Sequence, residues 1–588
     1  MNVLITTLNA KYIHTSLALR YLKAFCQDEF PIELVEYTIK DPAMNIVSDL
    51  FSKKPDVIGF SCYIWNIEET IQIISMLKKV MPGVKVVLGG PEVSYDVDYW
   101  MNRLSDVDFI VVGEGEETFR HLLQEMNGDQ KFHFVYGLAY RKGEELVINP
   151  PRPKLDLNEI PSPFYFAEDM PNLRNRVTYF ETSRGCPFSC QFCLSSIEVG
   201  VRYFDIERTK RDLLHLIESG AKLIKFVDRT FNIKRDYAME IFEFLIKNHQ
   251  GCVFQFEITA DIMRPEVLDY LAEHAPPGIF RFEIGVQSTN DVTNDIVKRR
   301  QNFAKLTRTV TKVKESGKID QHLDLIAGLP EEDYMSFRKT FNDVFALRPE
   351  ELQLGFLKML RGTGMRLEAQ KYEYKYMDHA PYEMLENRVL PFADIVRIKR
   401  VEDVLEKYWN AHRMDHTLLY LIEREFASAF DFFQEFGDFW EARGWSRIGH
   451  QLEDLFRRLH LFLSERKTSN LPMIEGLMKY DYFMNYKYKP RKVWWKHQID
   501  KAEQSRLLKL LAQMPSVAGE EFASLGLDEK LLHKHTMLEI LPFNADEYIV
   551  SGTMQEGKTL LLVYYNPEGN DKPCTYFIPL EALRKLPA

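Results

Sequence analysis

Three of the seven cysteines lie close together, in the segment Thr182-Ser-Arg-Gly-Cys186-Pro-Phe-Ser-Cys190-Gln-Phe-Cys193. Three thiolates within eight residues can wrap around one iron–sulfur cube and bind three of its irons. The remaining iron then has no protein ligand and can bind a substrate or cofactor directly. The alternative from spacing alone is a structural zinc site, which normally has four ligands and would need Cys252 or a histidine such as His215 as the fourth.

The remaining cysteines and the composition narrow the class of protein. Cys26, Cys62, Cys252 and Cys574 are isolated and are predicted to be small core residues. Seven cysteines in 588 residues are too few for a disulfide scaffold. Hydrophobic residues make up 45% and charged residues 27%, as in ordinary globular proteins, and a length of 588 residues predicts several domains.

The net charge of the chain and its first residues indicate which partners and which cellular location to expect. The net charge of −11 provides no global attraction to nucleic acid or to anionic lipid, which argues against a nucleic-acid partner. No apolar run approaches about 20 residues, and the start Met1-Asn-Val-Leu-Ile is typical of a strand rather than of a signal peptide. We therefore predict a cytoplasmic protein with no membrane partner.

The cysteine segment follows the first of six strand-like segments between residues 175 and 378. Helical patterns such as 208–218 and 236–248 separate these strands. Six β/α units in about 200 residues predict a partial TIM-type (β/α)6 barrel, with its active site at the carboxyl ends of the strands. The segments are Val177–Thr182, Leu223–Asp228, Val253–Ile258, Phe280–Gln287, Leu323–Pro330 and Leu352–Leu357.

The three cysteines, with Phe192 directly before the last of them and a barrel that opens at the same strand, resemble the radical S-adenosylmethionine (SAM) superfamily. The resemblance implies that Cys186, Cys190 and Cys193 hold a [4Fe-4S] cluster whose open iron chelates the amino and carboxylate groups of SAM. Reduction would then cleave SAM to methionine and a 5′-deoxyadenosyl radical, which abstracts hydrogen from an unactivated carbon.

The same resemblance assigns cofactor or substrate contacts to the ends of the later strands. The segment from Phe226 to Asn232 occupies the position where many relatives carry a glycine-rich acidic stretch that receives the SAM amino group, but its glycines are missing. A buried carboxylate must have a partner, so a core salt bridge is the alternative for each acidic residue. The predicted contacts are Asp228, Glu257, Glu283, Gln287 and Asp324.

Residues 1–130 alternate short apolar runs with amphipathic helical patterns. This alternation predicts an open parallel, Rossmann-like α/β sheet, which binds ligands beyond the carboxyl ends of its strands. Gly89-Gly90-Pro91-Glu92 and Gly113-Glu114-Gly115 each follow a predicted strand, where glycine lets the backbone approach a ligand closely. Two tight turns are the alternative. The Pro-rich segment 131–174 is predicted to be a linker.

An α/β domain before such a barrel resembles the cobalamin-binding domain of the cobalamin-dependent radical SAM class. Many of these domains carry Asp-x-His-x-x-Gly after the first strand, whose histidine ligates cobalt, whereas the corresponding loop from Leu8 to His14 lacks that spacing. A methylthiotransferase, with a second cluster on three N-terminal cysteines, is excluded because only Cys26 and Cys62 precede the linker. The cobalamin contacts that the resemblance implies are Gly89, Gly90, Glu92, Gly113 and Gly115.

Together the two resemblances imply a cobalamin-dependent methyltransferase. One SAM would give the radical, and the substrate radical would take a methyl group from methylcobalamin. A second SAM would remethylate the cobalt, and a donor such as flavodoxin or ferredoxin would supply the electron. The unknown substrate is predicted to be a small molecule. The alternatives are a cobalamin-dependent radical cyclisation or rearrangement, and a cobalamin- or iron-responsive binding protein that does not consume SAM.

Residues 379–588 are predicted to be mainly helical and rich in aromatic residues, with a small strand-bearing tail. The segment Lys487-Tyr-Lys-Pro-Arg-Lys-Val-Trp-Trp-Lys496 interleaves five basic residues with aromatic ones. Such a pattern can bind RNA by stacking and phosphate contacts. Because the whole chain is acidic, we favour a basic surface turn beside a buried Trp pair.

Overall fold

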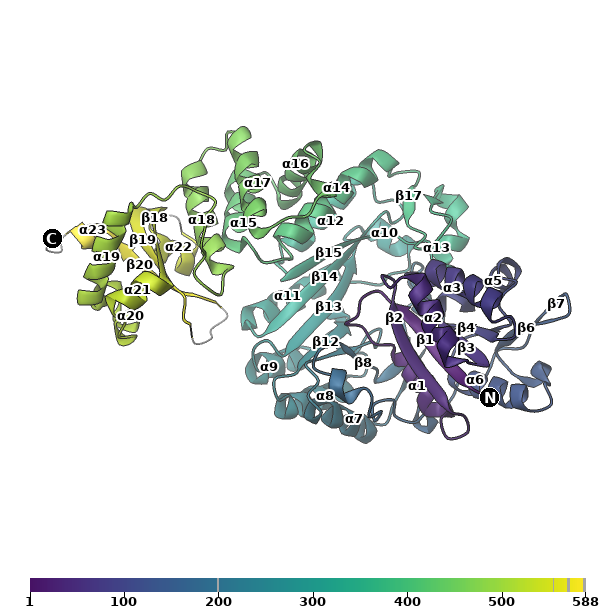
Figure 1. Cartoon of the computed structure of the whole chain (residues 1–588). Helices are drawn as coiled ribbons and strands as arrows, with labels where there is room; N and C mark the ends of the chain where they lie inside the picture. The colour runs from purple at the N-terminus through teal and green to yellow at the C-terminus, as the bar shows by residue number, and fades with distance from the viewer. Residues whose placement is uncertain (198–199, 554, 568–571, 585–588) are drawn as a thin grey trace. The chain divides into compact units, whose positions relative to one another are not determined.

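The computed structural model describes residues 1–197, 200–553, 555–567 and 572–584 (Figure 1). The chain divides into two units, Met1–Ile395 and Val396–Ala588. The predicted fold is confirmed: a parallel α/β domain, a parallel barrel and a mainly helical C-terminal region with a small sheet. Within the described residues, no helix combines the length and the apolar character needed to cross a membrane.

The first sheet has seven strands in the order β2-β1-β3-β4-β5-β6-β7, and its first five strands are parallel. Apolar side chains of α2, α3 and α5 cover one face, and those of α1 and α6 cover the other. Burial on both faces explains why every residue of β1 is buried. The elements are β1 (Val3–Asn9), α1 (Leu17–Cys26), β2 (Ile32–Thr38), α2 (Ala43–Lys53), β3 (Val57–Ser61), α3 (Ile67–Val80), β4 (Lys85–Gly89), α4 (Pro91–Ser94), α5 (Val97–Arg103), β5 (Phe109–Val111) and α6 (Glu116–Asn127).

The segment predicted to be a linker contains two strands of this first sheet. β6 (Leu138–Lys142) and β7 (Glu145–Ile148) form an antiparallel hairpin, and β6 pairs with β5. The prolines that suggested a linker lie after this hairpin, in the irregular stretch that leads to the barrel. The sheet therefore extends beyond residue 130.

The second sheet consists of six parallel strands in the order β15-β14-β13-β12-β11-β8, and its two edge strands do not pair with each other. The barrel is therefore open, as predicted, although β14 begins at Ile319, earlier than expected. The strands are β8 (Thr178–Phe180), β11 (Leu223–Phe226), β12 (Val253–Ile258), β13 (Phe280–Gln287), β14 (Ile319–Ala327) and β15 (Glu351–Phe356).

Alternation along the barrel strands separates an apolar outer face from a polar inner face. In β13, Phe280 and Phe282 are fully buried and pack against Phe242 of an outer helix, whereas Glu283 and Gln287 face inward and are half-buried. Side chains of period two thus give a helix-covered core and a polar interior. The outer helices in Figure 1 are α7 (Ile206–Glu218), α8 (Arg235–Asn248), α9 (Pro265–His274), α11 (Phe303–Ser316) and α12 (Tyr334–Phe345).

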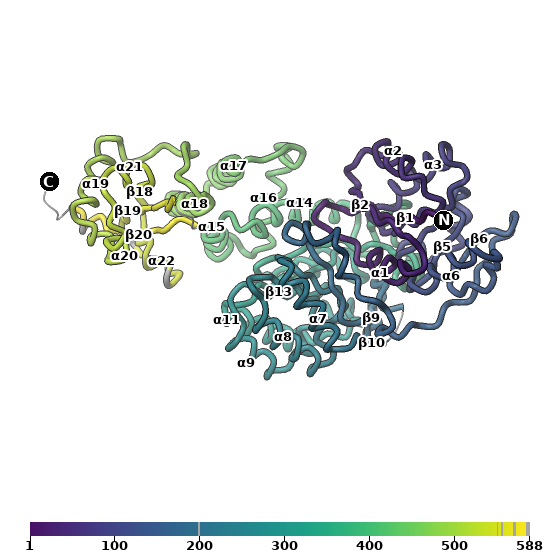
Figure 2. Tube along the Cα trace, turned by 60° about the horizontal axis from the view of Figure 1, so that its bottom comes forward, coloured from purple at the N-terminus to yellow at the C-terminus, as the bar shows by residue number. Residues whose placement is uncertain are grey.

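A short antiparallel hairpin carries the cysteine segment. β9 (Ser183–Cys186) pairs with β10 (Gly200–Tyr203), with Cys186 opposite Gly200. Figure 2 shows this hairpin between the barrel helices and the N-terminal α/β domain. Its position places the cysteines beside both parts of the first unit.

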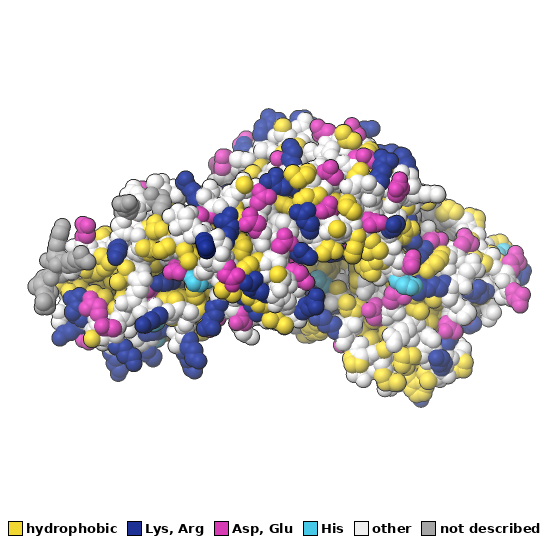
Figure 3. All heavy atoms as spheres, turned by 90° about the horizontal axis from the view of Figure 1, so that it is seen from above, with side chains coloured by type: hydrophobic (Ala, Val, Ile, Leu, Met, Phe, Trp, Pro, Cys, Tyr) yellow, Lys and Arg dark blue, Asp and Glu magenta, His cyan; other side chains and the backbone are white. Residues whose placement is uncertain are grey.

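The C-terminal unit combines helices with a three-stranded antiparallel sheet, in the order β18-β19-β20. Over most of the face drawn in Figure 3, acidic and basic side chains are interspersed. The elements after the barrel are α14 (Phe392–Tyr408), α15 (Asp415–Tyr420), α16 (Ala429–Ala442), α17 (Leu452–Glu465), α18 (Leu471–Met484), α19 (Lys501–Gln513), α20 (Glu520–Ser524), α21 (Glu529–His535), β18 (Thr536–Phe543), α22 (Ala545–Ser551), β19 (Glu556–Tyr564), β20 (Cys574–Pro579) and α23 (Leu580–Arg584).

Candidate functional site

The cysteine loop is held in place by the backbone around it. Gly185 has φ of +102°, and a Cβ there would lie 2.0 Å from the carbonyl oxygen of Gly200, so only glycine fits this crossing. The amide of Gln191 donates to the carbonyl oxygen of Val297 at 2.9 Å, and the carbonyl oxygen of Gln191 accepts from the amide of Met365 at 2.9 Å. The loop is thus attached to two other parts of the barrel.

The three cysteines of the loop are free thiols. Cys186 and Cys190 are buried and Cys193 is half-buried, and none of the three is in a disulfide. Within the described residues, no group of three Cys, His, Asp or Glu side chains is arranged to hold a single metal ion. The guanidinium of Arg299, 3.9 Å from the Cys190 sulfur, provides positive charge beside an anionic cluster.

Asp228, a predicted SAM contact, instead supports the start of the cysteine loop. Its carboxylate is fully buried and accepts hydrogen bonds from the Thr182 amide, at 3.0 and 3.1 Å, and from the Thr182 hydroxyl at 2.7 Å. The Ser183 hydroxyl donates at 2.5 Å. Because these donors occupy the carboxylate, the structure gives Asp228 a positioning role. The Asn232 side chain donates to the carbonyl oxygen of Thr259 and accepts from its amide.

The polar interior of the barrel brings together three of the predicted residues. Lys225 donates to Glu283 at 2.7 Å, and His322 Nε2 lies 3.1 Å from Asp324 Oδ1. Burial, with the nearby Glu283 and Asp324, raises the pKa of Glu257 to about 7, although Arg229 and Lys225 oppose this. The interior thus holds paired charges plus one carboxyl group that is partly protonated near neutral pH.

Gln287 has an unusual backbone at the carboxyl end of β13. Its φ is +67°, a left-handed conformation that costs energy outside glycine, and its side-chain oxygen is buried without a hydrogen-bond partner among the described residues. The Arg299 guanidinium, which lies beside Cys190, also donates to the carbonyl oxygen of Gly285. Gln287 therefore presents an unused acceptor close to the cysteine loop.

The predicted glycines lie at the carboxyl edge of the first sheet. Gly90 has φ of +105°, and a Cβ there would come within 2.6 Å of the carbonyl oxygen of Cys62. Gly113 has φ of +79° and faces open space, so a side chain there would fill a free edge. Gly89 ends β4, and Gly115 precedes α6. Of these four glycines, only Gly113 has no other atom within 4 Å of the position of a Cβ, so it marks the free part of this edge.

Glu92 does not lie free at this edge. It is buried, and its carboxylate accepts a hydrogen bond from the Tyr382 hydroxyl at 2.6 Å, with Arg361 4.0 Å away. Burial raises the pKa of Glu92 to about 7. The contact attaches the start of α4 to the segment after the barrel. Nearby, the rings of Tyr63 and Trp65 are stacked 4.3 Å apart at the end of β3.

Two ion pairs connect the edge of the first sheet to the hairpin that carries the cysteines. Arg184 of β9 lies 2.7 Å from Glu116 of α6 and 2.8 Å from Glu181. Arg202 of β10 pairs with Glu114, which stands between Gly113 and Gly115. The glycine turn and the cysteine loop are therefore fixed next to each other.

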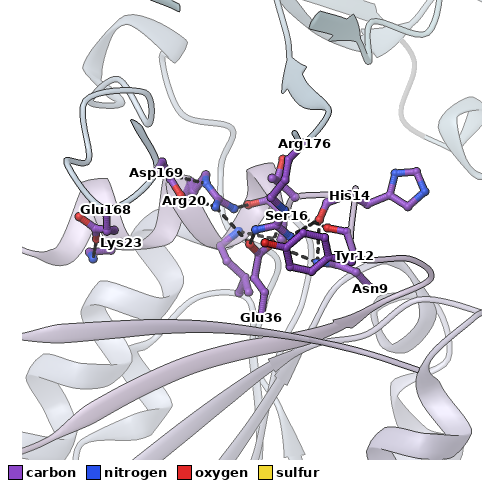
Figure 4. A network of polar contacts seen from close by, with 12 residues as sticks. Asn9, Tyr12, His14, Ser16, Arg20, Lys23, Glu36, Glu168, Asp169 and Arg176 are labelled. Atoms are coloured by element: carbon purple, nitrogen blue, oxygen red, sulfur yellow. Dashed lines mark hydrogen bonds and ion pairs between the residues drawn. The ribbon is translucent and has the colours of Figure 1, made fainter. Parts of the chain in front are cut away.

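The loop after β1 is fixed by a second polar network (Figure 4). Glu36 pairs with Arg20 at 3.1 Å and with Arg176 at 2.9 Å, and Arg20 also binds Asp169 at 2.6 Å. Although burial opposes ionisation, these arginines lower the pKa of Glu36. In Figure 4 the His14 ring points away from this network, and its Nδ1 lies 2.8 Å from the Tyr179 hydroxyl on β8.

Sequence reasoning missed Lys225, His322, Arg299 and the arginines of both networks. Lys225 and His322 lie at inward-facing positions of β11 and β14, where polar residues alternate with buried apolar ones. This alternation could have identified both as residues of the barrel interior. The partners of Arg184 and Arg202 are 68 and 88 residues away in the chain, and no local pattern identifies them.

Three segments of the chain match known protein families. Residues 3–123 match the B12 binding domain, and residues 180–344 match the radical SAM superfamily. Residues 370–563 match a family described as a protein of unknown function, DUF4080. A cobalamin-binding domain followed by a radical SAM barrel defines the class of the first unit.

Individual relatives agree with this class. The uncharacterized methyltransferase PH0819 of Pyrococcus horikoshii is 30% identical over 234 residues, 38% of this chain and 51% of that protein. The cobalamin-dependent radical SAM methyltransferase TokK of Streptomyces tokunonensis is 29% identical over 305 residues, 48% of this chain and 44% of TokK. The chain thus spans about half the length of the curated relatives it matches.

A solved structure supports the fold. The cobalamin-dependent S-adenosylmethionine radical enzyme OxsB with aqua-cobalamin bound superposes with a TM-score of 0.55 at 17% identity, over 81% of this chain and 80% of that one. At this identity the likeness concerns the fold alone. The first unit thus combines a segment that matches the B12 binding domain with a segment that matches the radical SAM superfamily.

Proposed function

We propose that this protein is a radical SAM methyltransferase that uses cobalamin to methylate an unactivated carbon of a small, polar molecule. The observation that carries the proposal is the pair of links from Arg184 to Glu116 and from Arg202 to Glu114. These links hold the predicted cobalamin edge next to the predicted cluster loop. Methyl transfer to a radical requires both cofactors to reach one substrate, so close positioning is the contribution expected of the protein.

Cys186, Cys190 and Cys193 would hold the cluster, with Arg299 compensating its charge. When bound, the cluster supplies reductive cleavage of SAM to a 5′-deoxyadenosyl radical, and cobalamin supplies the methyl group. The unpartnered oxygen of Gln287 supports a role in binding SAM, because a ligand hydroxyl or amine can satisfy it. Gly89, Gly90, Gly113 and Gly115 would leave room for the corrin.

The substrate would lie in the barrel interior. Lys225, Glu257, Glu283, His322 and Asp324 surround that space with charged groups, which supports a substrate that carries polar groups of its own. Burial raises the pKa of Glu257 to about 7, so this carboxyl group can donate or accept a hydrogen bond at working pH. A flavodoxin or ferredoxin is the proposed electron donor, and the cytoplasm is the proposed location.

The test is product analysis after anaerobic reconstitution with iron, sulfide and hydroxocobalamin. With dithionite and SAM we expect 5′-deoxyadenosine, and S-adenosylhomocysteine only when cobalamin is present. Cys190→Ala is the matched control and should form neither product. Absence of 5′-deoxyadenosine from the wild type would refute the radical step. 5′-Deoxyadenosine without S-adenosylhomocysteine would refute methylation and favour a cyclisation or rearrangement.

A further inference from the structure

The aromatic and basic segment of the C-terminal unit forms one wall of a cleft. Residues 482–499 contain five Lys or Arg residues and no Asp or Glu. After α18 the segment turns back across α17 and α18, and leaves a cleft of about 710 Å³. This volume is in the range of small-molecule sites, about 300–1,000 Å³. Arg457, His460, Leu461, Glu475, Lys479, Trp494, Trp495, Lys496 and Gln498 line the cleft.

The floor of the cleft is a buried ion pair. Lys479 Nζ lies 3.0 Å from Glu539 Oε1, and the two side chains are 7% and 0% exposed. The Trp495 indole donates to Glu539 at 2.8 Å, and His497 Nδ1 lies 3.2 Å from the same carboxylate. These contacts hold Trp495 in one orientation, because a buried carboxylate retains its donors strongly.

The aromatic wall has an unused donor. The Trp494 ring packs 5.2 Å from the His460 ring and 5.4 Å from the Trp495 ring. Its indole nitrogen is buried without a hydrogen-bond partner among the described residues. Buried indole N–H groups normally have an acceptor. Because Trp494 lines the cleft and is only half-buried, a molecule in the cleft can stack on its indole.

The charges at the rim favour an anion. Lys496 is exposed and makes no ion pair within the described part of the chain, and Arg457 is exposed and pairs with Glu453 on its own helix. The one acidic residue in the lining, Glu475, lies 2.6 Å from His460 Nε2, so a side chain of the cleft already partners it. The lining thus offers cationic groups to a ligand and no unpaired carboxylate.

We propose that this cleft binds a small molecule that has a planar ring and an anionic group, phosphate or carboxylate. The ring stacks on Trp494, and the anion lies near Lys496 and Arg457. The site is independent of the proposed methyl transfer, because all its residues belong to the C-terminal unit. A phosphate-bearing nucleotide and an aromatic carboxylic acid share this chemistry, and direct binding distinguishes them.

The experiment is isothermal titration of the full chain with adenosine 5′-monophosphate, nicotinate, adenosine and inorganic phosphate. We expect one of the two ring-bearing anions to bind at least tenfold more tightly than adenosine or phosphate. Trp494→Leu should weaken that binding on the order of tenfold, as loss of one stacked ring does. Lys496→Gln should weaken it about two- to fivefold, with a larger effect at low salt.

Matched controls keep the result specific. Trp445→Leu removes another half-buried indole of the same unit, and Lys501→Gln removes another exposed lysine; neither residue lines the cleft. Both variants should bind within twofold of the wild type. The proposal is wrong if neither ring-bearing anion binds with a Kd below about 1 mM. It is also wrong if the Trp494→Leu and Trp445→Leu variants bind that anion equally well. It is also wrong if inorganic phosphate alone binds as tightly as the ring-bearing anion that binds best.

Discussion

Replacing Arg184 with methionine tests the link between the two cofactor regions. The guanidinium is shared by Glu116 and Glu181, and the three side chains are only 15%, 6% and 13% exposed. Methionine keeps the length but leaves two nearly buried carboxylates without their cation. Removing one partner of a buried pair costs about 3–5 kcal/mol, and we take the lower value because Arg184 keeps some contact with water.

The expected change in melting temperature follows from the size of the first unit. An unfolding entropy of about 2.1 cal/mol/K per residue over Met1–Ile395 gives about 0.8 kcal/mol/K. A loss of about 3 kcal/mol should therefore lower the Tm of this unit by about 4 °C. Scanning calorimetry at pH 7.5 measures this change in Tm.

A second substitution makes the test specific. Glu116→Gln alone should lower the Tm by about 1–2 °C, since it removes a charged partner from Arg184. In the Arg184→Met background the same change should raise the Tm, since it removes one unpaired carboxylate. Arg281→Met, which breaks an exposed pair with Asp320, is the control and should change the Tm by less than about 1 °C. A Glu116→Gln effect of the same sign in both backgrounds would refute the reasoning.

Three further predictions concern buried carboxylates. Glu332 is fully buried, and burial raises its pKa to about 7. The folded state therefore keeps a proton that the unfolded chain releases near pH 4.5. As a result, the protein loses stability as the pH rises from about 4.5 to 7. The variant Glu332→Gln cannot ionise at this position. Its free energy of unfolding relative to the wild type should therefore rise by up to about 3 kcal/mol between pH 5 and pH 9, as measured by urea unfolding. A difference in unfolding free energy that does not change with pH would contradict this prediction. Asp228→Asn should lower the iron retained after reconstitution by half or more, because it weakens the support of Thr182 and Ser183; iron content equal to the wild type would show that this support is dispensable. Tyr382→Phe removes the hydrogen-bond donor to Glu92 and should lower the Tm by about 1–2 °C at pH 8. The decrease should be smaller at pH 5.5, because Glu92 is then protonated. Calorimetry at both pH values tests this, and a larger decrease in Tm at pH 5.5 than at pH 8 would contradict it.

The sequence predicted what depends on residue type and local spacing. The predicted cluster ligands, Cys186, Cys190 and Cys193, could be selected because ligation of a cluster restricts both the residue type and the spacing. The resemblance likewise selected Glu283 and Gln287, and the alternation along β13 places both on the inner face of the barrel. Such patterns arise from side-chain periodicity, which one segment contains entirely.

The rest depends on contacts between distant segments. Asp228 was predicted as a cofactor contact from its place after a barrel strand, but its hydrogen-bond donors, Thr182 and Ser183, come from the segment that follows β8. Glu92 likewise follows a glycine turn but binds Tyr382, 290 residues later. The hairpin β6–β7 was missed because the prolines after it dominated the composition of the segment.

Electron paramagnetic resonance of the anaerobically reconstituted, dithionite-reduced protein, with and without SAM, tests the central claim most directly. The account predicts the signal of a reduced [4Fe-4S]⁺ cluster that changes shape when SAM is added, because one iron has no protein ligand, and loss of that signal in Cys190→Ala. A signal that SAM leaves unaltered would contradict the open iron. A protein that retains only zinc, with no signal at all, would contradict the cluster itself.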